Sequence, residues 1–188
     1  AEVRNNSKLT VNGNTQFGRR INNNANAKLV GTAHIDGTLQ NSQGARLIAN
    51  TVNVNGSMRY FGYMEALDYS SVFGTLENPG EIRLFNTHIG SRGSGDIGTI
   101  GNTYTLKATG KTQVSGLLAN APGAIAEFSG NDSELVILSG GSVSNNGTLI
   151  ADSHVVNECG YFINGDNAQK TFTASPLRLR AVTRAVAK

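Results

Sequence analysis

The chain has 188 residues, a formal net charge of +3 and 15% charged residues, and it contains no tryptophan. Hydrophobic residues make up 38% of the sequence, whereas soluble globular domains reach about 45–50%. This shortage of large apolar side chains, together with 23 glycines, excludes a thick globular core and favours a narrow core with frequent turns.

The first part of the chain is polar, and we interpret residues 1–27 as an N-terminal segment or cap. A short repeated pattern follows: glycine, a small or β-branched residue, an aliphatic residue, any residue, asparagine and soon a second glycine. Residues 13–18 resemble a degenerate first copy. Clear copies begin at Gly37, Gly74, Gly116 and Gly141, and a weaker one at Gly56 lacks the asparagine.

The spacing of these copies is that of a solenoid. If Gly95 begins one more, eroded copy, the 104 residues from Gly37 to Gly141 form five steps of about 21 residues. Periods in the twenties are typical of solenoid proteins. Around the glycines, apolar and polar residues alternate in short runs, which predicts strands; the runs are 45–49, 51–55, 81–85, 124–128 and 148–151.

Three short strands per repeat predict an all-β fold, a single-stranded parallel β-helix (β-solenoid) over residues 28–175 with seven or eight coils of about 21 residues. The alternative is an antiparallel β-sandwich, which also combines short strands with glycine-rich turns. In a β-helix each coil pairs with the next at about 4.8 Å. The repeated asparagine is therefore expected to hydrogen-bond the asparagine of the next coil and to satisfy turn backbone.

Alternation also predicts which side chains point into the core. Val52 and Val54 share one side of a strand, as do Ile82 and Leu84. The full set expected in inward ladders is Leu39, Leu47, Val52, Val54, Leu76, Ile82, Leu84, Leu118, Ile125, Val143, Leu149 and Val155.

The phrase Gly-Thr-Leu-x-Asn with a trailing glycine, seen at residues 37–44 and 74–80, resembles the coils of filamentous-haemagglutinin-like and autotransporter-passenger β-helices. The resemblance covers roughly residues 28 to 165. It implies a parallel β-helix from a large secreted adhesin. The chain departs from that pattern in its shortness, in eroded coils near 59–73 and 91–105, and in its basic end.

The residues that most often carry chemistry do not cluster in the sequence. His34, His88 and His154 lack metal-ligand spacing, and His88 and His154 are expected about three coils apart, at roughly 15 Å. Asp132 and Glu134 flank Ser133 as a solvated pair. The Gly-x-Gly-x-x-Gly match at 93–98 is not followed by a helix, so we interpret it as a loop. The single cysteine, Cys159, is expected to be buried.

We therefore expect no enzyme, no catalytic residue, no metal site and no cofactor. The sequence favours a structural or adhesive extracellular module, including a self-assembling fibre or matrix subunit. The alternative is a carbohydrate-active β-helix enzyme or a phage tail-spike fragment, which would gather its acidic residues in a groove. The abundance of Ser, Thr, Asn and Gly, with Ala1 as first residue, favours a secreted or cell-surface location.

Residues 176–188 form a basic C-terminal tail that carries Arg178, Arg180, Arg184 and Lys188. The body of the chain lacks a basic stripe with interleaved aromatic residues, so no nucleic-acid partner is expected. No run approaches the roughly 18 apolar residues of a membrane helix. Because a solenoid exposes unpaired backbone at its ends, we predict self-association there, with these four basic residues in the joint; a self-capping tail is the alternative. A cell-surface glycan is a further expected partner.

Overall fold

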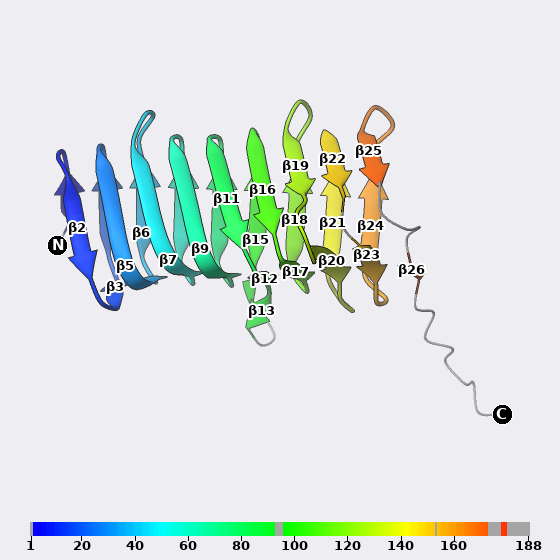
Figure 1. Cartoon of the computed structure of the whole chain (residues 1–188), viewed down its shortest axis with the longest axis horizontal. Coiled ribbons are helices and arrows are strands. Elements are labelled where there is room, and N and C mark those ends of the chain that lie inside the picture. The colour runs from blue at the N-terminus through cyan, green and yellow to red at the C-terminus, as the bar shows by residue number, and fades with distance from the viewer. Residues whose placement is uncertain (1, 93–95, 153, 173–177, 180–188) are drawn as a thin grey trace.

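The structure is a computed structural model that describes residues 2–92, 96–152, 154–172 and 178–179. The described chain is all-β, and its strands stack in parallel into a solenoid (Figure 1). The predicted parallel β-helix is therefore confirmed, and the antiparallel β-sandwich is wrong, because every strand that links one coil to the next pairs in parallel.

Each coil contributes one strand to a nine-stranded sheet, and we call these the A strands. In spatial order they are β1 (Val3–Asn5), β4 (Arg20–Asn23), β6 (Thr38–Asn41), β8 (Ser57–Tyr60), β10 (Thr75–Asn78), β15 (Thr99–Asn102), β18 (Leu117–Asn120), β21 (Ser142–Asn145) and β24 (Tyr161–Asn164).

The remaining coil segments form a fifteen-stranded sheet. In three coils one long strand bends through two segments: β5 (Asn26–Ile35), β7 (Arg46–Val54) and β9 (Tyr63–Val72). We call the first halves of these, with the strands in register beside them, the B strands: β2 (Leu9–Asn12), β11 (Glu81–Phe85), β16 (Thr105–Thr109), β19 (Ile125–Phe128), β22 (Thr148–Ala151) and β25 (Gln169–Phe172).

The second halves and their partners are the C strands: β3 (Thr15–Phe17), β12 (Thr87–Ile89), β17 (Lys111–Val114), β20 (Glu134–Ile137), β23 (His154–Asn157) and β26 (Arg178–Leu179). A coil thus runs through one A, one B and one C segment before it rises to the next coil.

The coils are more numerous and mostly shorter than the sequence predicted. Register partners in the A strands are 18 residues apart between Ile21 and Leu39 and 19 apart between Leu39 and Met58. Two coils are longer, with 24 residues from Leu76 to Ile100 and 25 from Leu118 to Val143. The expected period of about 21 averaged these two lengths, and the expected seven or eight coils missed those whose A strands carry no clear glycine.

The longest insertion is a hairpin that leaves the stack between two C–A positions. It pairs β13 (Ser91–Arg92) with β14 (Asp96–Ile97) in an antiparallel arrangement and projects from one edge of the stack (Figure 1). The chain leaves at Gly90 and returns at Gly98, whose N–H donates to the Gly90 carbonyl at 2.6 Å. The eroded copy of the repeat therefore begins at Gly98, and placing it at Gly95 was wrong.

The repeated glycine is required by the contact between coils. A Cβ atom on Gly74 would lie 2.0 Å from the carbonyl oxygen of Gly56, and one on Gly56 would lie 2.1 Å from that of Gly37. The same closeness recurs at Gly116, whose Cβ would lie 2.2 Å from the Gly98 oxygen. The turn before each A strand thus packs backbone against backbone, and only glycine leaves room for it.

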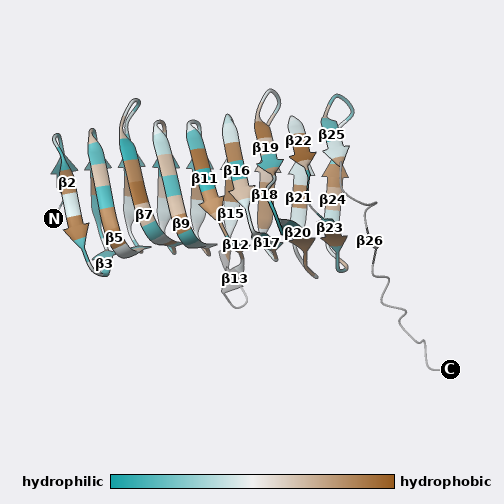
Figure 2. Cartoon of the chain, viewed as in Figure 1, coloured by the Kyte–Doolittle hydropathy of each residue, from teal (hydrophilic) through white to brown (hydrophobic). Residues whose placement is uncertain are grey.

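The core is a set of aliphatic ladders, and the alternation that builds it is visible in Figure 2. Of the twelve residues predicted to point inward, eleven are at most 3% exposed. Ile125 is the exception, at 40%. In its strand the residues that face inward are Ala126 and Phe128, because the large ring of Phe128 fills the core better than Ile125 would in the opposite phase.

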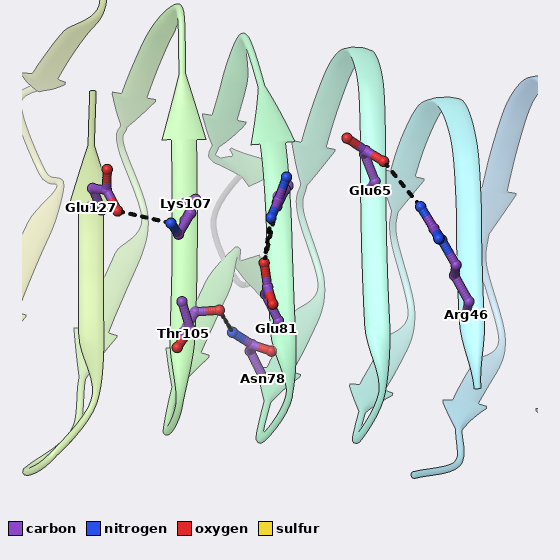
Figure 3. Close-up of polar contacts among 8 residues, drawn as sticks. Arg46, Glu65, Asn78, Glu81, Thr105, Lys107 and Glu127 are labelled. Atoms are coloured by element: carbon purple, nitrogen blue, oxygen red, sulfur yellow. Dashed lines mark hydrogen bonds and ion pairs between the residues drawn. The ribbon is translucent and has the colours of Figure 1, made fainter. Parts of the chain in front are cut away.

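The predicted asparagine ladder is confirmed. Asn78 Nδ2 donates to Asn102 Oδ1 at 2.7 Å, and Asn102 Nδ2 donates to Asn120 Oδ1 at 2.8 Å. Each amide also reaches the backbone that begins a B strand, as Asn78 does with the Thr105 carbonyl at 2.8 Å (Figure 3). The ladder runs through Asn5, Asn23, Asn41, Asn78, Asn102, Asn120, Asn145 and Asn164.

The two ends of the chain enter the same stack. β1, β2 and β3, which lie within residues 1–27, pair with the following coil as the other strands do. At the other end, the backbone of β26 pairs with β23 and so completes the last coil. The side chains of the four basic tail residues lie outside the described residues.

Candidate functional site

All three histidines lie on the outer side of the C strands and do not meet. His34 and His88 occupy one row, three coils apart, through Asn53 and Ser71. His34 Nδ1 lies 3.3 Å from Asn53 Nδ2, and His88 Nε2 lies 3.2 Å from the Ser115 hydroxyl. His154 lies in the neighbouring row beside Glu134, three coils beyond His88, as its spacing predicted.

The acidic pair at 132–134 is divided between a turn and a strand. Asp132 lies in the turn with a φ of 61°, whereas Glu134 begins β20 and forms an ion pair with Lys111 at 3.1 Å. Between them, the Ser133 hydroxyl donates to the Ser129 carbonyl at 2.7 Å and accepts the Gly110 N–H at 3.0 Å. This serine closes the turn, so the two carboxylates do not act as a pair.

Cys159 is exposed, and the expectation of a buried thiol was wrong. It lies in the turn between a C strand and an A strand, with a φ of 61°. A residue in that turn is not part of the alternation that buries strand residues, which is why the neighbouring apolar sequence misled the prediction.

The most elaborate outer surface belongs to the B strands. Glu65, Arg83, Lys107 and Glu127 are register partners in four consecutive coils, so they form one row with a spacing of about 4.8 Å. We call these four residues the charged row. They come from β9, β11, β16 and β19, and each is separated from the next by 18 to 24 residues of chain.

Each member of the charged row has an ion-pair partner of its own. Lys107 Nζ lies 3.3 Å from Glu127 Oε2, and Arg83 lies 3.0 Å from Glu81 Oε1. Glu65 reaches Arg46 at 4.0 Å from the coil on the other side. Figure 3 shows these side chains on adjacent strands of the same outer face. The pairing leaves a face of alternating charge.

A groove of about 420 Å³ follows the charged row. Its other lining residues include two apolar side chains that are exposed, Leu67 at 47% and Phe85 at 37%, and the hydroxyls of Thr109 and Ser129. The Ser129 hydroxyl donates to Glu127 at 2.8 Å. The groove therefore offers charged, hydroxyl and apolar contacts within four coils.

Tyr63 lies between two arginines at the edge of this face. The guanidinium of Arg46 is 4.7 Å from the centre of its ring, and that of Arg83 is 5.4 Å away. Partial burial raises the pKa of Tyr63, and the neighbouring Glu65 carboxylate adds to the increase. The hydrogen bond from Glu81 raises the pKa of Arg83. The aromatic ring thus holds both cations in fixed positions on the rod.

The charged row does not bring two carboxylates close together. Glu65 and Glu127 are three coils apart, at about 14 Å, whereas the paired carboxylates of glycoside hydrolases lie about 5–9.5 Å apart. Across the described residues, no three His, Cys, Asp or Glu side chains are grouped as metal ligands. The arrangement is suited to binding a partner through many weak contacts.

Sequence reasoning missed the charged row because its members are far apart in the chain. The signal that would have found it is the coil period itself, since residues 18 or 24 positions apart share a row only when the two coil lengths are known. The long coil between Glu81 and Thr105, which includes the hairpin, shifted the phase of any fixed repeat of about 21 residues.

Comparison of the chain with protein-family models, with curated proteins and with solved structures finds no match. No described segment forms a helix with the length and apolar character needed to span a membrane.

Proposed function

We propose that the chain is a structural and adhesive β-solenoid module: a rigid rod that presents a mixed-charge binding face to a surface. The observation that carries the proposal is the charged row with its groove, held across four coils of one continuous stack. A β-stack fixes the outward side chains at a regular spacing, so little conformational freedom is lost when a partner binds.

The ladders support the rigidity of such a rod. The aliphatic core continues from Ile21 to Val155 as one cluster, and the asparagine ladder links neighbouring coils beside it. The repeat phrase that resembles filamentous-haemagglutinin-like and autotransporter-passenger β-helices favours the same function. With it we propose a secreted or cell-surface location and a cell-surface glycan among the partners.

The test is binding of the purified, fluorescently labelled chain to epithelial cell monolayers. We expect saturable binding that weakens at least several-fold in the double variant Arg83→Ala, Lys107→Ala, since both cations line the groove. The matched control is Arg4→Ala, whose side chain is 67% exposed on the outer side of an A strand. Binding that does not saturate, or that the control weakens equally, would contradict the proposal.

The first coil favours a second candidate function, self-association into fibres. β1, β2 and β3 each pair on one side only, and the apolar side chains of this coil line a small cavity of about 20 Å³. Val3 is 49% exposed there. Because the stack is parallel throughout, the free edge of the first coil is complementary to the last coil of a second copy, and such heterologous contacts need not close.

Self-association is tested by sedimentation velocity over a wide concentration range, with electron microscopy of the largest species. We expect head-to-tail oligomers that Val3→Lys disrupts, because a charge at this edge opposes strand addition. Deletion of residues 176–188 examines the basic tail: if the full chain stays monomeric and the truncated chain aggregates, the tail only caps the stack and the fibre idea fails.

A further inference from the structure

A second hollow lies beside the charged row, where the A strands turn into the B strands. Its volume is about 510 Å³, and it crosses the turns of four consecutive coils, from Gln43 to Tyr104. At the coil spacing it is about 14 Å long. Three aromatic side chains line it, Phe61, Tyr63 and Tyr104.

The floor of this hollow has no side chains, for a reason that lies in the fold. A Cβ atom on Gly62 would lie 2.1 Å from the Ala45 carbonyl oxygen, and one on Gly80 would lie 2.3 Å from the Gly62 oxygen. Coil contact therefore requires glycine at both turns. Bare backbone at the floor, with aromatic rings around it, makes a concave surface open to solvent.

The aromatic rings are held or exposed in ways that suit a flat ligand. Tyr104 is 60% exposed, so its ring is available at the rim. Phe61 is held by the guanidinium of Arg59, 4.8 Å from its ring centre, and Tyr63 by Arg46 at 4.7 Å. Arg59 in turn pairs with Glu77 at 3.2 Å. Two rings are thus fixed and one is free to cover a ligand.

The polar groups at the hollow determine the chemistry of the ligand. Gln43 is exposed and offers an amide that both donates and accepts, and Glu81 offers a carboxylate that accepts. The only charged residue that lines the hollow within the described part of the chain is Glu81, whose carboxylate pairs with Arg83. An anionic ligand would meet no unpaired cation here, whereas hydroxyl groups can donate to Glu81 and exchange hydrogen bonds with Gln43.

We propose that this hollow binds a neutral oligosaccharide, whose sugar rings stack on Tyr104 and Phe61 while their hydroxyls bond Glu81 and Gln43. A sugar ring combines a C–H face, which packs on an aromatic ring, with a rim of hydroxyls, and the hollow has both complements. The proposal deepens the adhesive function and rests on it. It assigns the ligand to the aromatic hollow, distinct from the charged row.

The test uses the full chain and tyrosine fluorescence, since the protein contains no tryptophan. The probes are the hexaoses of cellulose, mannan, xylan, starch and chitin, with heparin as the acidic comparison. We expect at least one neutral hexaose to bind at millimolar concentration or below, with affinity reduced at least tenfold by Tyr104→Ala and several-fold by Gln43→Ala. Tyr161→Ala, at a side chain 67% exposed on an A strand, is the matched control and should bind normally.

The opposite outcomes are equally clear. If none of the five hexaoses binds at millimolar concentration, or if only heparin binds, the proposal is wrong. It is also wrong if Tyr104→Ala and Tyr161→Ala bind alike. Adhesion to cells that survives Tyr104→Ala but is lost in Arg83→Ala, Lys107→Ala would leave the adhesive function in place and reject this ligand. Circular dichroism of each variant establishes that the stack is intact.

Discussion

Tyr60 is the register partner of Asn41 in the A strands and occupies the position that asparagine holds in the neighbouring coils. Its ring is completely buried, and its hydroxyl has no hydrogen-bond partner in the structure. The amide ladder is therefore interrupted between Asn41 and Asn78, and the large ring fills the core where an amide would have stacked. The weaker repeat copy at Gly56, which lacks asparagine, encodes this interruption.

Replacing Tyr60 by Phe should stabilise the protein by about 1 kcal/mol at neutral pH, because a buried hydroxyl without a partner costs free energy. The measurement is urea denaturation of both proteins. Tyr161→Phe, at a solvent-exposed ring, is the control and should leave stability unchanged. A loss of stability in Tyr60→Phe would mean that the hydroxyl has a partner.

Tyr60 should also make the fold sensitive to alkali. Burial raises its pKa well above the ordinary 10.0 in the folded state. The unfolded chain therefore loses this proton first, so stability is complete below about pH 10 and falls as the pH rises from there toward the folded pKa. Denaturation curves at pH 8 and pH 11 should show a smaller loss for Tyr60→Phe than for the unaltered chain. Equal losses would contradict the prediction.

Asn102 should be among the most sensitive polar positions. It accepts from Asn78 at 2.7 Å, and it donates to Asn120 at 2.8 Å and to the Ile125 carbonyl at 2.8 Å. Asn102→Ala leaves these buried groups without partners, so we expect a loss of about 2–4 kcal/mol in the free energy of unfolding. Gln40→Ala, an outward amide on an A strand, is the control and should change it by less than about 0.5 kcal/mol.

Two glycines give a matched test of coil contact. Gly74→Ala places a methyl group 2.0 Å from the Gly56 oxygen, and we expect it to cost more than about 3 kcal/mol or to prevent folding. Gly101→Ala meets no atom within 4 Å, and it should stabilise by about 0.4–1 kcal/mol by restricting the unfolded chain. Thermal denaturation compares the two; similar effects at both sites would reject the proposed role of the turn glycines.

The inward and outward assignment of strand residues is tested by two truncations. Leu84 is 3% exposed, and Leu84→Ala should cost about 2–5 kcal/mol through lost burial and the cavity it leaves. Ile125 is 40% exposed, and Ile125→Ala should change stability by less than about 1 kcal/mol. Chemical denaturation of both variants decides the matter, and a reversed order would mean that the register of β19 is wrong.

The fold and most of the core followed from local patterns. Alternating apolar residues predicted the strands and eleven inward side chains, because a strand exposes its residues to opposite sides with a period of two. Where apolar residues occupied both phases, as with Ile125 and Phe128, alternation alone chose wrongly. The choice there depends on which ring or methyl group fills the space left by neighbouring coils, and that is a property of the packed core.

The sequence by itself determined the parallel stack, its glycine turns and its asparagine ladder, because each of these is a local requirement repeated in every coil. Only the tertiary structure decided the coil lengths, the place of Gly98 after the hairpin, and the outer rows that join Glu65, Arg83, Lys107 and Glu127. The physical reason is that rows form by register between coils. An insertion of a few residues in one turn leaves each strand unchanged and alters which residues, far apart in the chain, come to lie side by side.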